Sequence, residues 1–274
     1  PQYEWGYVHK AKILFERMEN AEAETLFIKA LKCDQNAKEA LQGMALLYER
    51  KKQWDEAAKY AARAVDADPQ CAKSLVLLGG LMLRRHQYQS AEVVFRRALE
   101  ITPDDIQALH HLVNSLLPQK KMEQSLQYVE RFLSLQPDHK IMRHFRALLT
   151  GMPVDQSPPE YISSLFDGYA EQFEHHLQER LQYAVPEKLA SIISTLPGVK
   201  DKAPLSLLDL GCGTGLVAQA MQAFTHQRIG VDLSPKMLEK AYSKQLYDAL
   251  YPLDVVEFAN GSERTFDLVT AGDV

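Results

Sequence analysis

The fold is decided by the stretch Asp209-Leu210-Gly211-Cys212-Gly213-Thr214-Gly215. It follows the apolar run 205–208 and precedes a helix-like run at 216–220. A strand, a tight glycine loop and a helix, in this order, are the layout with which α/β proteins hold a nucleotide-like cofactor. Glycine allows positive φ and a close approach of the backbone to a ligand. The spacing is Gly-x-Gly-x-Gly, not the Gly-x-Gly-x-x-Gly of dinucleotide folds, and this difference argues against a nicotinamide cofactor.

Two further acids follow where neighbouring strands are predicted to end. Asp232 closes the apolar run 228–231. It follows the loop by about 20 residues in the sequence, which is where dinucleotide folds place the acid that accepts ribose hydroxyls. Asp254 closes the next predicted strand, within reach of an adenine amino group. Each has a simpler reading. Asp232 would serve only as a helix N-cap, although Ser234 already fills that role, and Asp254 would be a loop acid.

The second half of the chain alternates between predicted strands and helices. Strands are predicted at 205–209, 228–232, 250–254 and 266–271, and helices at 186–195, 216–223 and 234–243. The aromatic-rich stretch 161–182 is predicted to be one helix. This alternation indicates a parallel sheet with crossover helices, in which ligands bind at the carboxyl ends of the strands.

The first half repeats itself with a period of 34 residues. Alanines recur at 30, 64 and 98, and prolines recur at 69, 103 and 137. Four copies are predicted near 4–37, 38–71, 72–105 and 106–139, followed by a capping helix at 140–150. Small residues let paired helices approach closely, and neighbouring copies bury each other's apolar faces. The array should therefore stack into a superhelix with a concave groove.

These patterns divide the chain into three parts. We expect an all-α repeat array over 1–150, a proline-rich linker over 151–159 and an α/β part over 160–274. The fold class is thus α + α/β. The first residue is proline, at a position where an upstream copy would end, so we expect that the array has lost at least one repeat.

The composition limits the classes of binding partner and the cellular compartment that we expect for this protein. A formal net charge of −5 gives no support for broad electrostatic binding to nucleic acid or anionic lipid, and no apolar run is long enough to cross a membrane. Three widely spaced cysteines predict reduced thiols in a cytoplasmic protein. The histidine pairs at 110–111 and 175–176 have no partners at metal-ligand spacing, so no metal site is predicted.

The motif set resembles two known families. The repeats resemble tetratricopeptide repeats. The α/β part resembles class I S-adenosylmethionine-dependent methyltransferases, with a Rossmann-like sheet, through the motifs at 209–215, 231–234, 236–238, 253–255 and 266–269. Residues 165–177 look like the helix that precedes this domain in bacterial-type methyltransferases with tetratricopeptide repeats. Together the two resemblances cover nearly the whole chain.

The resemblance implies a cofactor site for S-adenosylmethionine. Its residues would be Asp209, Gly211, Cys212, Gly213, Gly215, Asp232, Leu233, Asp254, Val255, Tyr169 and Phe173. The loop would border the methionine part, Asp232 would bind the ribose, and Leu233 would pack on the adenine. Asp254 and the backbone of Val255 would read the adenine edge. Tyr169 and Phe173 would form a lid near the sulfonium, or would simply pack a core. Asp273 is a candidate near the transferred methyl group, or a loop acid.

The resemblance also implies a strand order and a function. The first strand would lie in the middle of the sheet, with the second and third on one side and the fourth on the other. The family has seven strands and this chain supplies four, so we expect a truncation after the fourth strand as well as the lost repeat at the other end. The leading hypothesis is a methyltransferase whose array recruits a protein or peptide substrate; a small-molecule acceptor is also compatible. The alternatives are a scaffold with a degenerate, non-catalytic docking module, and a nicotinamide-dependent oxidoreductase.

Overall fold

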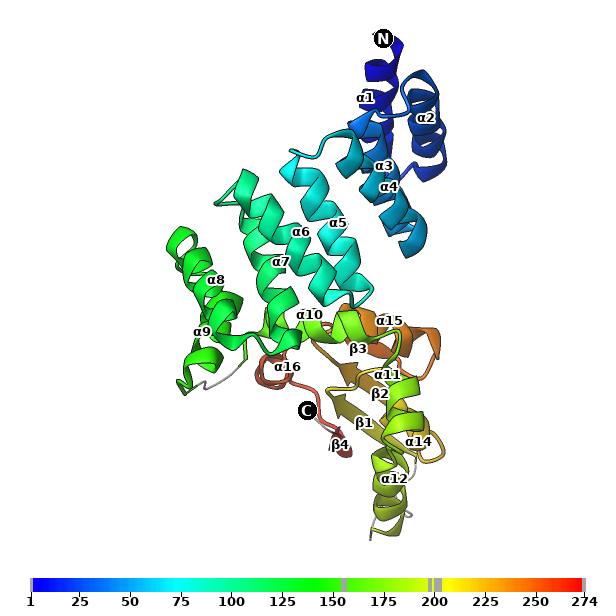
Figure 1. Cartoon of the computed structure of the whole chain (residues 1–274). Coiled ribbons are helices and arrows are strands. Elements are labelled where there is room, and N and C mark those ends of the chain that lie inside the picture. The colour runs from blue at the N-terminus through cyan, green and yellow to red at the C-terminus, as the bar shows by residue number, and fades with distance from the viewer. Residues whose placement is uncertain (1, 154–156, 197–198, 200–203, 273–274) are drawn as a thin grey trace. The chain divides into compact units, whose positions relative to one another are not determined.

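The computed structural model describes residues 2–153, 157–196, 199 and 204–272. Two compact units divide the chain, residues 1–154 and residues 155–274 (Figure 1). The first is all-helical and the second contains a four-stranded parallel sheet. The predicted α + α/β fold class is therefore confirmed. In the described part of the chain no helix is both long and apolar enough to cross a membrane.

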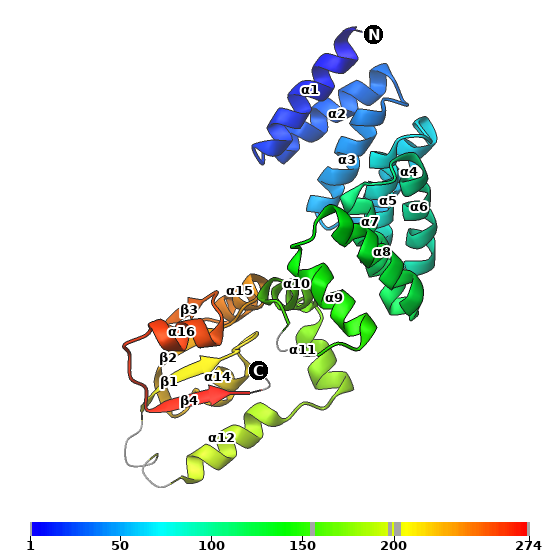
Figure 2. The ribbon, with the colours of Figure 1, turned by 90° about the vertical axis from the view of Figure 1, so that its left-hand side faces the viewer.

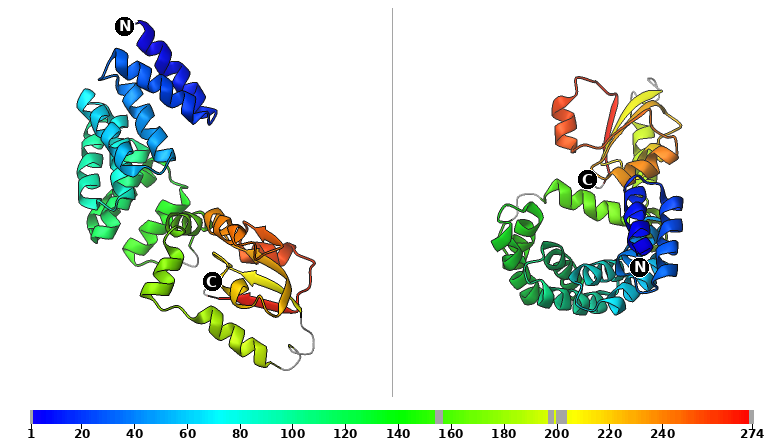
Figure 3. Two further views of the ribbon diagram at one scale, coloured as in Figure 1. Left: turned by 90° about the vertical axis from the view of Figure 1, so that its right-hand side faces the viewer. Right: turned by 90° about the horizontal axis from the view of Figure 1, so that it is seen from above.

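Helices of the first unit come in pairs, as the 34-residue period predicts, and the pairs follow one another along a curved array (Figure 3). The last helix coincides with the predicted capping helix. The helices are α1 (Gln2–Glu16), α2 (Asn20–Cys33), α3 (Lys38–Arg50), α4 (Trp54–Ala67), α5 (Ala72–Arg84), α6 (Tyr88–Ile101), α7 (Ile106–Leu116), α8 (Met122–Leu135) and α9 (Lys140–Thr150). A short 3₁₀ turn, η1 (Leu117–Gln119), follows α7.

The turns inside the pairs repeat as faithfully as the helices. Met18, Lys52, His86 and Lys120 lie 34 residues apart, one in each turn, and their φ values are 66°, 58°, 56° and 58°. These are left-handed conformations that non-glycine residues adopt at some cost in energy. The same geometry in all four pairs shows that the repeat extends to the backbone of the turns.

Large rings against small residues form the core of the array. The rings of Phe27 and Phe95 are fully buried. Each contacts a glycine, Gly43 for Phe27 and Gly79 for Phe95. A Cβ on Gly79 would stand 2.6 Å from a Phe95 ring atom, well inside van der Waals contact. Glycine at these helical positions therefore provides the space that lets the helices pack closely.

The sheet of the second unit has the order β3-β2-β1-β4, with all three pairings parallel. This is the predicted order, with the first strand in the middle. The strands are β1 (Leu205–Leu210), β2 (Thr225–Val231), β3 (Ala249–Tyr251) and β4 (Leu268–Ala271). The register pairs Leu208 with Ile229 on one side and with Val269 on the other.

Two apolar clusters cover the two faces of the sheet. Leu207 packs with Ile193 of α12 (Val185–Thr195) and with Val217 of α14 (Leu216–Ala220). Leu208, the next residue, packs with Phe258 of α16 (Val255–Gly261). Figure 2 shows α12 and α16 on opposite sides of the sheet. Neighbouring residues of β1 thus face opposite helices, as the two-residue period of a strand requires.

Several predicted boundaries are wrong. β2 begins at Thr225 and ends at Val231, rather than at 228 and 232. β3 ends at Tyr251 rather than 254, because the side chain of Asp254 caps α16 by accepting from the backbone N–H groups of Val256 and Glu257. β4 begins at Leu268 rather than 266, and α14 ends at Ala220 rather than 223. The predicted helix 161–182 is divided into α10 (Pro159–Tyr169), α11 (Phe173–His175) and a π-helical turn, η2 (His176–Arg180).

Candidate functional site

The glycine loop between β1 and α14 takes a conformation that side chains disfavour. Gly211, Gly213 and Gly215 have φ values of 62°, 51° and 89°. An added Cβ at Gly213 would meet only a Phe173 ring atom, 3.8 Å away, whereas at Gly215 it would stand 3.0 Å from the Tyr247 ring. The three glycines are therefore needed for the path of the backbone, and Gly213 leaves the loop open toward a cavity.

Asp232 joins the ends of β1 and β2. One carboxylate oxygen accepts from the backbone N–H of Gly213 at 2.9 Å, and the other accepts from the backbone N–H of Ser234 at 2.8 Å. Burial raises the pKa of Asp232, although these two bonds oppose the shift. Ser234 caps α15 (Pro235–Ser243) with its hydroxyl, as predicted. The acid thus fixes the loop while lining the cavity.

Asp209 lies beneath the loop. It is 1 % exposed, and its two oxygens accept from the Tyr247 hydroxyl at 2.6 Å and from the Thr270 hydroxyl at 2.8 Å. Burial raises its pKa to about 6, because the hydroxyls around it are neutral and leave its charge uncompensated. Asp209 is not among the residues that line the cavity, so its contact with a cofactor stays a prediction.

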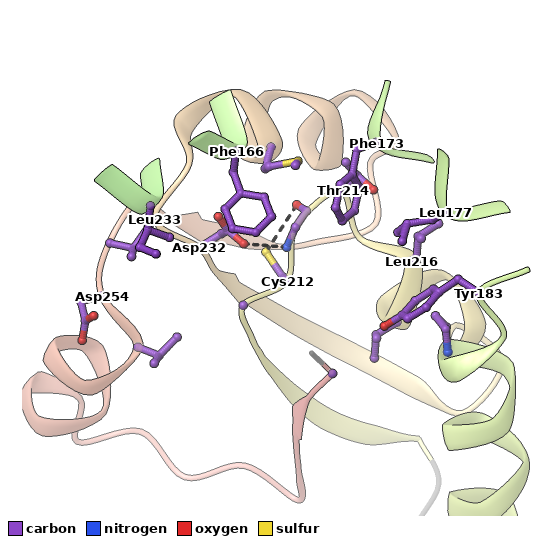
Figure 4. A pocket seen from close by; sticks show the side chains of 18 residues that line it. Phe166, Phe173, Leu177, Tyr183, Cys212, Thr214, Leu216, Asp232, Leu233 and Asp254 are labelled. Carbon is purple, nitrogen blue, oxygen red and sulfur yellow. Dashed lines mark hydrogen bonds between the residues drawn. The ribbon is translucent and has the colours of Figure 1, made fainter. Parts of the chain in front are cut away.

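The cavity has a volume of about 470 Å³, within the usual range of roughly 300–1,000 Å³ for small-molecule sites. Figure 4 shows Leu233 and Asp254 at one end, the glycine loop in the middle and Tyr183 at the other end. Its lining includes eight residues of the predicted site: Gly211, Cys212, Gly213, Asp232, Leu233, Asp254, Val255 and Phe173.

Three predicted residues lie outside that lining. Gly215 is the N-cap of α14, Asp209 lies beneath the loop, and Tyr169 packs edge-on against Phe173 with ring centroids 5.6 Å apart. Asp273 falls outside the described residues. The sulfur of Cys212 is buried, and burial raises the pKa of this thiol, so it is protonated at neutral pH.

Sequence reasoning missed part of the aromatic wall. Phe166 and Tyr183 line the cavity, and Phe166 meets Phe173 edge-on at a centroid distance of 6.3 Å. The density of aromatic residues between 161 and 183 was the available signal. In the described part of the chain no lysine, arginine or histidine lines the cavity, which presents carboxylates and rings instead. Such a lining favours a cation over an anion.

Comparisons with known proteins agree with this geometry. A family model described as a methyltransferase domain matches residues 173–274, and a tetratricopeptide repeat model matches residues 9–70 and 41–106. No curated protein matches the chain.

Two solved structures show the fold of the helical part. A crystal structure of the MamA protein is 16 % identical, covers 63 % of this chain and 95 % of its own, and has a TM-score of 0.51. MamA from residue 41 onward, of Desulfovibrio magneticus RS-1, is 15 % identical, covers 55 % and 85 %, and has a TM-score of 0.51. The chain is therefore a tetratricopeptide-repeat protein that carries a methyltransferase domain.

Proposed function

We propose that the cavity binds S-adenosylmethionine and that the second unit transfers its methyl group. The observation that carries the proposal is the loop of positive-φ glycines, held open toward the cavity by the bond from the Gly213 N–H to Asp232. The Gly-x-Gly-x-Gly spacing of the loop speaks against a dinucleotide, whose binding folds carry Gly-x-Gly-x-x-Gly. The carboxylates and rings suit a sulfonium.

Each part of the lining has a role in this proposal. The backbone of Gly211 and Gly213 borders the methionine part. Asp232 keeps lone pairs free for ribose hydroxyls, because each of its oxygens accepts one backbone bond. Leu233 packs on the adenine, and the second oxygen of Asp254 faces the adenine edge together with the backbone of Val255. Asp209 supports the loop from below.

The protein contributes positioning and shielding rather than acid–base chemistry. When bound, the cofactor would supply an activated methyl group; the methyl–sulfur bond would break as the acceptor's nucleophile bonds to the methyl carbon, leaving a neutral thioether. The rings of Phe166 and Phe173 exclude water and present π faces to the cation. Tyr169 acts through Phe173, whose ring it supports. We propose that the reaction is accelerated because the cofactor and the acceptor are oriented toward each other in a site that excludes water.

In this proposal the array recruits the methyl acceptor. We place the array at 1–150, a linker at 151–159 and the methyltransferase domain at 160–274. Stacked helix pairs form a concave surface on which a protein or peptide can lie extended. A small-molecule acceptor that enters the cavity directly is the competing form of the same activity. Reduced cysteines fit a cytoplasmic setting.

Titration calorimetry tests the cofactor. We expect heat with S-adenosylmethionine and none with a nicotinamide dinucleotide. Asp232→Asn should weaken binding about 10- to 100-fold, because a charged acceptor is lost while one oxygen remains for the backbone. Glu239→Gln is the matched control, an exposed acid on α15 outside the cavity lining, and should leave affinity unchanged. Absence of heat with S-adenosylmethionine, or equal affinity for Asp232→Asn, would refute the proposal.

A further inference from the structure

One face of the segment that walls the cavity carries three acids. They are Asp167 on α10, Glu171 in the following turn and Glu174 on α11. All three meet α15, and they do so in order along both segments. Asp167 accepts from the Ser234 hydroxyl at 2.5 Å and from the backbone N–H of Lys236 at 3.1 Å. Acids facing the start of a helix are favourably placed, because its backbone N–H groups point toward them.

The two acids that follow each pair with a lysine of the same helix or its end. Lys240 donates to Glu171 at 2.9 Å, and Lys244 donates to Glu174 at 2.5 Å. The first pair is well exposed, with side-chain exposures of 40 % and 61 %, and the second is less so, at 24 % and 34 %. Burial is the largest influence and raises the pKa of Glu174, but the interactions with Lys244, Thr214 and Lys240 together outweigh it, so the pKa is lowered. Glu174 is therefore charged at neutral pH.

These contacts hold parts of the cavity directly. Phe166 precedes Asp167 and Phe173 precedes Glu174, and both rings line the cavity (Figure 4). Ser234, which donates to Asp167, also donates its backbone N–H to Asp232. The acids therefore fix both the aromatic wall and the carboxylate at the end of β2.

Polar contacts help to hold the segment that walls the cavity. Among the described residues of α10 and α11 none is buried, whereas α12 buries Ile193 and α16 buries Phe258. The contacts of Asp167, Glu171 and Glu174 with α15 and its ends are charged or polar, and ion pairs of this kind weaken as salt screens them.

We infer that Asp167, Glu171 and Glu174 form an electrostatic latch, which positions the aromatic wall and Asp232 and sets the rate of ligand exchange. The inference deepens the proposed function, because its ligand is the cofactor of that site. Opening the latch swings Phe166 and Phe173 away from the glycine loop. Ligand entry and release then follow the strength of the three contacts, so exchange accelerates as ionic strength rises.

A charge swap at the exposed pair tests the latch. Glu171→Lys and Lys240→Glu should each raise the dissociation rate of S-adenosylmethionine about two- to five-fold, as expected for an exposed ion pair. The double variant should return the rate toward the wild-type value. Glu239→Lys, an exposed charge change on α15, is the matched control and should leave the rate unchanged. Stopped-flow displacement by unlabelled cofactor measures the rates.

Hydrogen exchange gives a second readout that requires no ligand. Amides of residues 159–176 should exchange faster in each single variant and recover in the double variant. Unchanged exchange in the single variants, or no recovery in the swap, overturns the latch. If S-adenosylmethionine fails to bind at all, the proposed function falls, and hydrogen exchange in the free protein still decides the latch.

Discussion

Glycine serves a different purpose in each of the two units. In the array, Gly79 has an ordinary helical backbone, and only the Phe95 ring forbids a side chain. In the methyltransferase unit, Gly213 has room for a methyl group, and only its φ of 51° disfavours one. One position is restricted by volume and the other by backbone conformation. The array thus depends on packing between helices, and the site depends on the path of one loop.

Buried acids differ between the units in the same way. Glu92 of the array accepts hydrogen bonds from Lys121, Gln119 and Arg96. Burial pushes its pKa up, but these donors outweigh it and the pKa is lowered. Asp209 receives only neutral hydroxyls, and its pKa is raised to about 6. The array surrounds its buried carboxylate, Glu92, with positively charged donors. The site buries the carboxylate of Asp209 without a compensating positive charge, so its ionised form is destabilised.

The largest effect is expected in the core of the array. Phe95→Ala removes a fully buried ring and should lower the free energy of unfolding by about 3–5 kcal/mol. Both tryptophans, Trp5 and Trp54, lie in the array, so fluorescence during urea unfolding reports this unit. Val93→Ala on the same helix is the control: Val93 is 68 % exposed, and its change should stay within about 0.5 kcal/mol. Equal losses in both variants would contradict the packing account.

The next effect is a pH dependence with opposite signs in the two units. Asp209 binds its proton more tightly when folded, with a pKa of about 6 against an ordinary 3.8. Raising the pH from 4 to 6 should therefore lower the stability of the methyltransferase unit by about 2 kcal/mol, out of about 3 kcal/mol for the whole shift at about 1.4 kcal/mol per unit of pKa. Asp209→Asn should reduce this slope and leave the part that the raised pKa of Asp232 contributes. Hydrogen exchange read over β1 and β2 measures it.

Glu92→Gln supplies the matched comparison in the array. The lowered pKa of Glu92 gives stability that is present above its ordinary pKa of 4.5 and is lost as the pH falls through the folded value. The free energy of unfolding of the wild-type array should thus fall on acidification, and that of the Glu92→Gln variant should fall less. Slopes of the same sign in both units would contradict the contrast between the two acids.

A smaller effect separates two adjacent glycines of α5. Gly79→Ala forces a methyl group into the Phe95 ring and should cost about 1–3 kcal/mol. Gly80→Ala meets nothing within 4 Å and should stabilise the helix by about 1 kcal/mol. Phe95→Leu should partly rescue Gly79→Ala, because it gives back volume. Urea unfolding of the four variants measures the signs, and absence of rescue would weigh against a restriction by volume.

The smallest expected effect is at the loop. Gly213→Ala should cost about 1 kcal/mol through backbone strain alone. Phe173→Leu should not rescue it, since the added Cβ lies 3.8 Å from that ring. Gly261→Ala, with nothing within 4 Å, is the control and should be tolerated. Hydrogen exchange over 209–216 reads the local change. A rescue by Phe173→Leu would show that Gly213 is restricted by the volume of its surroundings rather than by its backbone conformation.

The sequence predicted the parts of the fold whose signals are local. The 34-residue period placed the helix pairs and the capping helix α9, because each copy carries its own small residues and proline. The loop and Asp232 emerged from the spacing of residues that end neighbouring strands, and the structure brings both to one cavity.

Contacts between residues that are far apart in the sequence could not be predicted from such local signals. Asp167 meets Ser234 from 67 positions away, and Tyr247 meets Asp209 from 38 positions away, with no spacing rule to announce either pair. The end of β3 was missed because the carboxylate of Asp254 competes for backbone N–H groups and starts a helix instead. Side-chain geometry, rather than hydrophobic periodicity, decided these features.

The backbone bonds of Asp232 and Asp254 have an evolutionary consequence. Both acids anchor main-chain N–H groups as well as facing the cavity. A relative that lacked the proposed methyl transfer would still be selected to keep them, because the loop and the start of α16 depend on them. The persistence of these acids therefore marks ancestry rather than activity. Leu233 lines the same cavity through an apolar side chain that anchors no backbone group, so divergence at that position is the earlier sign of a lost function.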